Sequence, residues 1–181
     1  MFNALMFMLF LGLTPTFSWD LIESKIEIDF PNTPTVTIED LNNMMLKNSK
    51  KTLIIDVRSK SEYDVSHIKG ALHFEDPQII DVYLNKYTKE HGKPDNIILY
   101  CSVGYRSAKA AQALIMLGHN KVYNLKGSIF AWGNKGFDVY RSSKDHEIPT
   151  DKIHPYDQSW GLLLDENLRS YTPSQSKPMD H

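Results

Sequence analysis

Short apolar runs recur along this chain in a pattern that predicts buried strands. Three of them are continuous, occupy residues 53–57, 97–101 and 122–125, and are rich in the Ile, Leu, Val and Tyr residues that buried strands prefer. Two shorter segments, 35–36 and 71–74, are expected to form further strands, the first of them at an edge. The pattern therefore predicts a sheet made mainly of buried strands.

Segments with helical periodicity separate these runs. A helix is predicted over residues 77–91, with five side chains facing inward: Ile79, Ile80, Val82, Tyr83 and Tyr87. A second helix follows Ser107, where alanine and leucine recur at helical spacing, and a third begins after Thr37, because Asp40 lies where a capping box needs an acid. Strands that alternate with helices imply right-handed crossovers, so the predicted fold class is α/β with a parallel sheet.

The central run ends at Cys101, the only cysteine of the chain, and Gly104 and Arg106 follow it closely. The thiol is therefore predicted to lie on a tight turn between a strand end and a helix start. The free N–H groups and the dipole of a helix start stabilise a thiolate and can bring a cysteine pKa to roughly 3.5–7.5. Gly104 allows a positive φ, and Arg106 adds a fixed positive charge. The alternative interpretation is a buried cysteine that only fills space.

Three motifs, in this order, resemble those of single-domain rhodaneses, the rhodanese-like sulfurtransferase family. Residues 56–71 are similar to the family's D-V-R-x-x-x-E-[FY]-x-x-G-H-I-x-G-A, residues 101–107 to its C-x-x-G-x-R loop, and residues 122–132 to its closing V-x-x-L-x-G-G-x-x-x-W. Ser66 and Ser128 stand where the family usually has glycine. The resemblance implies a three-layer domain over residues 35–141, with a central parallel sheet and helices on both faces.

The same resemblance implies sulfur transfer through a persulfide on Cys101. The thiolate would take sulfane sulfur from thiosulfate or a related donor and pass it to a thiophilic acceptor such as cyanide or a small thiol. Asp56 and Arg58 would support the site as a structural ion pair. The donor would bind to the loop that follows the cysteine, which comprises Ser102, Val103, Gly104, Tyr105, Arg106 and Ser107.

Two other functions remain open at this point. Tyrosine phosphatases and arsenate reductases of related fold use a C-x5-R loop that surrounds a tetrahedral oxyanion. Here four residues separate Cys101 from Arg106, and the shorter loop suits a single sulfur atom better. A non-catalytic sulfur-carrier or redox-sensing module would form the persulfide without turnover.

The amino-acid composition limits which binding partners and cofactors can be expected. The 181 residues include 20 basic and 22 acidic side chains, and the net charge of −2 gives no reason to expect nucleic acid or an anionic membrane surface as a partner. One cysteine excludes an internal disulfide framework and a thiolate zinc cluster, and the seven histidines lack metal-ligand spacing. We therefore expect no metal and no cofactor, and we interpret His67 as structural.

The termini predict further segments. Residues 1–18 have an uncharged apolar core and resemble a secretory signal peptide, so export (secreted, periplasmic or into the secretory pathway) is expected, with no stable membrane contact after cleavage. A retained membrane anchor or a buried N-terminal helix is the alternative. Residues 19–34 are interpreted as a linker, 142–171 as an apolar and aromatic extension packed on the domain, and 172–181 as a disordered tail.

Overall fold

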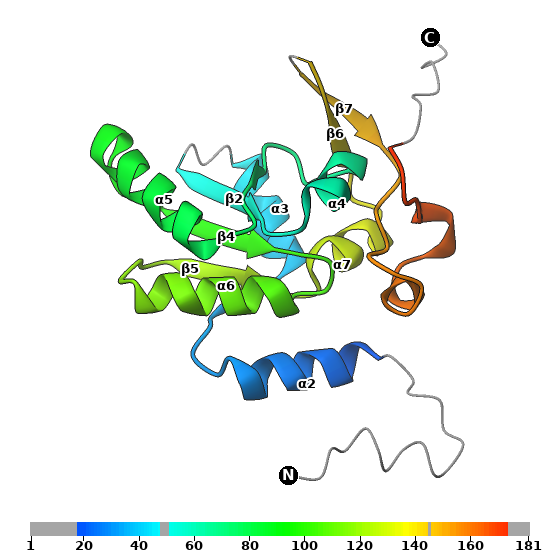
Figure 1. Ribbon diagram of the computed structural model, residues 1–181, viewed down its shortest axis with the longest axis horizontal. Helices are drawn as coiled ribbons and strands as arrows, with labels where there is room; N and C mark the ends of the chain where they lie inside the picture. Colours follow the sequence, from blue (N-terminus) through cyan, green and yellow to red (C-terminus); the bar gives the residue numbers. More distant parts are fainter. Residues whose placement is uncertain (1–17, 48–50, 145, 174–181) are drawn as a thin grey trace.

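A five-stranded parallel sheet forms the centre of the molecule. The computed structural model describes residues 18–47, 51–144 and 146–173 (Figure 1). The strand order is β1-β5-β4-β2-β3, and every pairing is parallel, which confirms the predicted fold class. The strands are β1 (Thr35–Val36), β2 (Thr52–Asp56), β3 (Leu72–His73), β4 (Asn96–Tyr100) and β5 (Val122–Leu125).

Helices cover both faces of this sheet (Figure 1). Side chains of successive strand residues point to opposite faces, so Ile98 joins one apolar cluster while Ile97 and Leu99 join the other. The cluster of Ile97 and Leu99 includes residues of α5 (Pro77–His91) and α6 (Tyr105–Met116). The cluster of Ile98 includes residues of α3 (Ile38–Leu46) and α7 (Ser128–Asn134). The short helix α4 (Lys60–Val65) follows β2 in the chain. The three layers that the sequence predicts are therefore present.

The sequence predicts the boundaries of the helices well, but it does not predict correctly which side chains of each helix face inward. The capping box of Thr37 and Asp40 is present, and α5 spans the predicted residues. On α5, however, Ile80 and Leu84 are buried, whereas Ile79 and Val82 are 54% and 66% exposed. The prediction that these last two face inward was wrong, because the face of this helix that meets α6 and the sheet carries Ile80, Leu84 and the partly buried Tyr83.

The expected linker over residues 19–34 is instead largely helical. Helix α2 (Trp19–Asp29) starts at Ser18, whose Oγ accepts the N–H of Leu21. Its buried residues Ile22 and Ile26 join the main apolar cluster, and α2 lies along α6 in Figure 1. The linker interpretation overlooked the i, i+4 spacing of these two residues, which carries the helix onto the domain.

The C-terminal extension begins with a hairpin that the sequence analysis did not predict. Strands β6 (Val139–Ser143) and β7 (His146–Thr150) pair antiparallel, so the expected boundary between residues 141 and 142 falls inside a strand. Two short 3-10 helices follow, η2 (Trp160–Leu163) and η3 (Glu166–Leu168). Ile153 and Leu164 are buried in the main cluster, so the extension packs against the domain.

The expected signal peptide and most of the expected disordered tail fall on residues 1–17 and 174–181, which lie outside the described residues. Among the helices of the described residues, none combines the length and the apolar character needed to cross a membrane.

Candidate active site

Cys101 lies directly after β4, on the turn that leads into α6. Its side chain is almost fully buried, and the N–H of Gly104 donates to its Sγ at 3.1 Å. Gly104 has a φ of +109°, and a Cβ at this position would lie 3.3 Å from Cδ1 of Ile26. Glycine is therefore required both for the backbone conformation and for the close approach of α2.

The surroundings of Cys101 favour the thiolate. Burial raises the pKa of the thiol, but the charge of Arg106, the hydroxyl and N–H of Ser107 and the N–H of Gly104 together lower it below its usual value. Ser107 is fully buried and is held by a 2.7 Å hydrogen bond from its Oγ to Oδ1 of Asn124. The cysteine is thus prepared to act as a nucleophile.

Ser128 explains why a residue other than glycine is tolerated in the closing motif. It has a φ of +53°, in the left-handed region that favours glycine. Its buried Oγ accepts the N–H of Cys101 at 3.1 Å and donates to the carbonyl of Leu125 at 3.2 Å. The two hydrogen bonds tie the start of α7 to the cysteine and offset the backbone strain.

Glu62 connects α4 to the cysteine loop. Its carboxylate accepts two hydrogen bonds from the guanidinium of Arg106, at 2.9 and 2.7 Å, and one from Oγ of Ser102 at 3.0 Å. Burial raises the pKa of Glu62, but the hydrogen bonds and charge of Arg106, with smaller effects of Arg58 and the Ser59 N–H, lower it to about 2. Glu62 is the glutamate of the first motif, at residues 56–71, and its pairing with Arg106 was not predicted from the sequence.

Asp56 and Arg58 form a fully buried ion pair beneath the loop. The Arg58 guanidinium donates to both Asp56 carboxylate oxygens, at 2.7 Å for Nη2–Oδ2 and 3.0 Å for Nε–Oδ1, and Nη2 also donates to the carbonyl of Ser66 at 2.6 Å. Neither residue lines the cavity at Cys101. The buried His67 ring forms hydrogen bonds through Nδ1 with the carbonyl of Tyr63 at 3.2 Å and through Nε2 with Oε1 of Glu147 at 3.1 Å. These contacts fit a structural role for His67.

A cavity of about 200 Å³ opens above Cys101. Its other lining residues are Ser102, Val103, Tyr105, Arg106, Tyr156 and Trp160. Gly104 and Ser107, which were expected to bind the donor, lie behind the thiol and act on it through hydrogen bonds. Tyr156 and Trp160 come from the extension, and sequence reasoning missed them, although their segment was expected to pack on the domain because it is aromatic.

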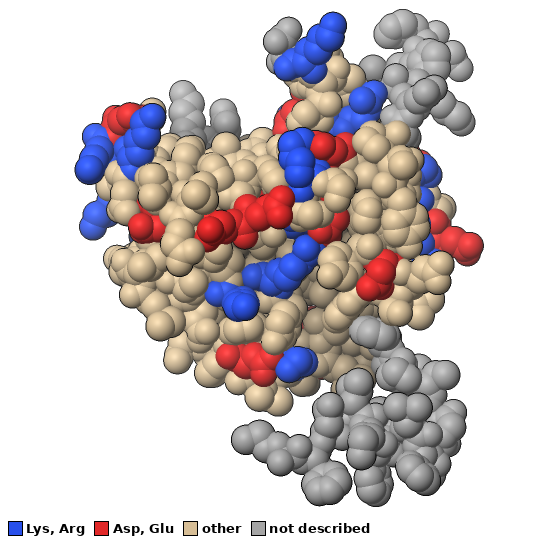
Figure 2. All heavy atoms as spheres, in the orientation of Figure 1, with Lys and Arg blue, Asp and Glu red and all other residues tan. Residues whose placement is uncertain are grey.

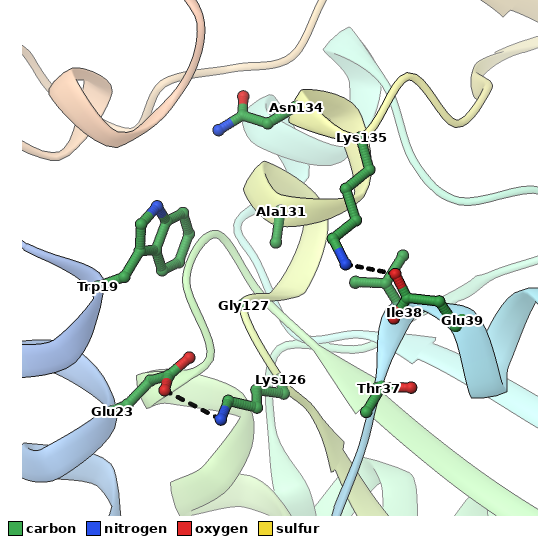
Figure 3. A pocket seen from close by; sticks show the side chains of 10 residues that line it. All are labelled: Trp19, Glu23, Thr37, Ile38, Glu39, Lys126, Gly127, Ala131, Asn134 and Lys135. Atoms are coloured by element: carbon green, nitrogen blue, oxygen red, sulfur yellow. Dashed lines mark hydrogen bonds and ion pairs between the residues drawn. The ribbon is translucent and has the colours of Figure 1, made fainter.

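A larger hollow of about 460 Å³ lies between α2, α3 and α7 (Figure 3). Trp19 forms one side, and its charged residues are already paired: Lys126 lies 3.0 Å from Glu23, and Lys135 bonds to Glu39. No nucleophilic thiol lines it among the described residues. The smaller cavity at Cys101 is therefore the candidate active site.

Several known proteins resemble this chain. A curated tRNA uridine(34) hydroxylase from Yersinia pestis is 24% identical over 151 residues, which cover 78% of this chain and 39% of that protein. The chain therefore spans about two fifths of the length of the curated relatives it matches. A solved structure of a protein from Bacillus halodurans is 26% identical, with a TM-score of 0.51 over 66% of this chain and 85% of that one.

Two further solved structures share the fold at lower identity. A thiosulfate sulfurtransferase from Pseudomonas aeruginosa has a TM-score of 0.56 at 19% identity, over 68% of this chain and 23% of that one. A protein of unknown function from Rhodopseudomonas palustris, described as a possible tyrosine phosphatase, has a TM-score of 0.51 at 20% identity, over 70% of this chain and 96% of that one. The family model of the rhodanese-like domain matches residues 37–135, more than half of the 181 residues. The chain therefore belongs to the family of rhodanese-like domains.

Proposed function

We propose that this protein is a sulfurtransferase that works through a persulfide on Cys101. The observation that carries the proposal is the thiol itself, which has a lowered pKa, faces a cavity and accepts the N–H of Gly104 at 3.1 Å. A persulfide keeps its negative charge on the outer sulfur. Backbone N–H groups of a tight loop are suited to stabilise that charge because they are oriented before the reaction begins.

The proposed reaction has two steps. The Cys101 thiolate attacks the transferable sulfur of the donor, and the bond that holds this sulfur breaks. Its electron pair leaves with sulfite from thiosulfate, with the glutathione thiolate from glutathione persulfide, or with the enolate of pyruvate from mercaptopyruvate. A thiophilic acceptor such as cyanide then attacks the outer sulfur of the persulfide and releases the thiolate again. Because a covalent intermediate separates the two substrates, ping-pong kinetics are expected.

The test is mass spectrometry of the purified protein after incubation with thiosulfate, mercaptopyruvate or a glutathione persulfide. The expected result is a mass increase of one sulfur atom on Cys101, reversed by cyanide with formation of thiocyanate. Cys101→Ser is the control and should show neither change. Absence of the sulfur adduct with all three donors would refute the proposal.

The names of two similar proteins describe other activities, a tRNA hydroxylase and a possible tyrosine phosphatase. Assays of the purified protein can distinguish the alternatives to sulfur transfer. The hydroxylase activity belongs to proteins of which this chain spans 39%, and the possible tyrosine phosphatase shares only the fold at 20% identity. Turnover of p-nitrophenyl phosphate that disappears in Cys101→Ser would favour oxyanion chemistry. Stoichiometric persulfide formation without turnover would favour a sulfur-carrier or sensing module.

We also propose that the protein is exported, on the basis of the uncharged apolar core at residues 5–13. Expression of the full chain, cell fractionation and N-terminal sequencing of the product test this. Cleavage near residue 18 and recovery outside the cytoplasm are expected, whereas an intact N-terminus in the cytoplasm contradicts export.

A further inference from the structure

The positive charge at the cavity is largely compensated. Among the described residues that line the cavity, only Arg106 has a cationic side chain. Both of its terminal nitrogens donate to Glu62, and the ring of Tyr156 covers the guanidinium at 4.9 Å. The Cys101 thiolate adds a negative charge to the same site. A doubly charged inorganic donor therefore meets little net attraction there.

The remaining walls are aromatic or apolar. Val103, Tyr105, Tyr156 and Trp160 make up most of the lining. The cavity volume of about 200 Å³ corresponds to roughly seven water molecules at their liquid volume. Thiosulfate has only five heavy atoms, so a donor can carry a carbon group into this space together with its transferable sulfur.

The turn that carries Tyr156 and Trp160 has a specific backbone conformation that local contacts maintain. Tyr156 has a φ of +65°, in the left-handed region, and its side chain is 47% exposed, so burial in the core does not hold it there. Oδ1 of Asp157 accepts the N–H of Trp160 at 2.9 Å. A Cβ at Gly161 would approach Cβ of Pro155 to 3.0 Å, so glycine keeps this turn tight.

We infer that Tyr156 and Trp160 determine donor specificity, and that the preferred donors are organic sulfane-sulfur compounds of single negative charge with an aromatic group. Thiosulfate is then a poor donor. The inference rests on the proposed sulfurtransferase function. Figure 2 shows basic and acidic side chains close together over the start of α6, so this face presents no single-sign field to draw in an inorganic dianion.

Benzenethiosulfonate represents the inferred donor class. The Cys101 thiolate forms a bond to its outer sulfur, the sulfur–sulfur bond breaks, and benzenesulfinate leaves with the electron pair. One thiolate and one thiosulfonate anion thus become one persulfide anion and one sulfinate anion, so atoms and charge balance. Cyanide then removes the outer sulfur as thiocyanate and restores the thiolate.

Three donors with the same transferable sulfur test the inference: thiosulfate, methanethiosulfonate and benzenethiosulfonate. Methanethiosulfonate carries one negative charge fewer than thiosulfate, and benzenethiosulfonate carries an aromatic ring in place of the methyl group of methanethiosulfonate. We expect kcat/KM to rise at both steps, by roughly tenfold for the ring, as for one well-packed aromatic contact. Trp160→Ala and Tyr156→Gly should each reduce the ratio of benzenethiosulfonate to thiosulfate kcat/KM by several fold.

The variants are chosen to separate specificity from folding. Tyr156→Gly suits the positive φ and removes a half-exposed ring, so it is expected to fold, and Trp160→Phe keeps an aromatic group if Trp160→Ala melts early. Leu162→Ala is the matched control, because Leu162 lies in the same η2, is 68% exposed and does not line the cavity. It should leave the ratio unchanged.

Each outcome decides a different point. If thiosulfate is the best donor, or if the ratio of benzenethiosulfonate to thiosulfate kcat/KM in Tyr156→Gly and in Trp160→Ala equals that of the wild type, then the extension does not select the donor and the inference is wrong. If Trp160→Ala does not fold, an unchanged ratio in Tyr156→Gly decides the point. If none of the three donors forms a persulfide but mercaptopyruvate or glutathione persulfide does, the inference alone fails. If mercaptopyruvate and glutathione persulfide also form none, the sulfurtransferase proposal fails, and the inference fails with it.

Discussion

Replacing Glu62 with glutamine tests whether the buried carboxylate organises the cysteine loop. Gln has almost the same shape, but it removes the charge that accepts two hydrogen bonds from Arg106 and one from Ser102. The fold should persist because the change is nearly isosteric, but the amide NH2 that replaces one carboxylate oxygen faces N–H donors, which adds to the loss of stability. Two results are expected from the loss of charge: lower stability, and a guanidinium whose positive charge is no longer compensated.

The magnitude follows from the pKa of Glu62, which the folded protein lowers from 4.5 to about 2. At about 1.4 kcal/mol per pKa unit, the folded state gains about 3 kcal/mol from the ionised carboxylate. Because the pKa is lowered, this gain is complete above pH 4.5 and is lost as the pH falls through 2. The Arg106 side chain is 36% exposed, so water can solvate it in the variant. We therefore expect a loss of about 2–3 kcal/mol at pH 7.

Urea unfolding of wild type and Glu62→Gln at pH 7 and pH 3 measures this. The difference in unfolding free energy between wild type and Glu62→Gln should be about half as large at pH 3 as at pH 7, because the stabilisation by the ionised carboxylate decreases as the pH falls toward its pKa. Glu23→Gln is the control, because Glu23 pairs with Lys126 on the surface and should contribute little. Equal stability of Glu62→Gln and wild type at both pH values would refute the reasoning. The uncompensated Arg106 should also shift donor preference toward thiosulfate.

Three further predictions concern the loop itself. Cys101→Ser should abolish sulfur transfer and leave the urea midpoint nearly unchanged, because Ser can accept the Gly104 N–H in place of the thiolate. The rate of persulfide formation should rise with pH and level off below the ordinary thiol range, and Arg106→Ala should move this profile to higher pH, because the Arg106 charge lowers the pKa of Cys101. Gly104→Ala should lower both the urea midpoint and the transfer rate, because φ is +109° and Cδ1 of Ile26 lies 3.3 Å from the added Cβ; unchanged values would show that the loop adapts.

Local signals explain which parts of the fold could be predicted from the sequence. The continuous apolar runs became β2, β4 and β5, and α5 spans the predicted residues 77–91. The segments that were missed carry weaker local patterns. The hairpin strands β6 and β7 are mostly half-exposed and include Arg141, His146 and Glu147, so their pairing follows from contacts with the domain rather than from an apolar run.

The same distinction applies to the site. The residues from Cys101 to Ser107 are contiguous, so their strand–turn–helix arrangement could be predicted from one stretch of sequence. Glu62 lies 44 positions from Arg106, and Tyr156 and Trp160 lie still farther along the chain on the other side. Such pairings depend on how the segments pack against each other, and a single sequence considered alone does not contain that information. The place of Glu62 in the first motif was the one available clue.

Arg106 shows why these distant residues belong to one site. Its guanidinium bonds to Glu62 of α4, contacts Ser102 of the loop at 3.0 Å and lies beneath the ring of Tyr156 from the extension, while its charge lowers the pKa of Cys101. The Cys101 sulfur accepts backbone N–H groups, and Arg106, which lines the cavity, keeps both terminal nitrogens bonded to its carboxylate partner. A change in the extension should therefore reach the cysteine through Arg106. The aromatic turn at Tyr156 and the cysteine loop are therefore linked through Arg106, although only the loop belongs to the region that the family model matches.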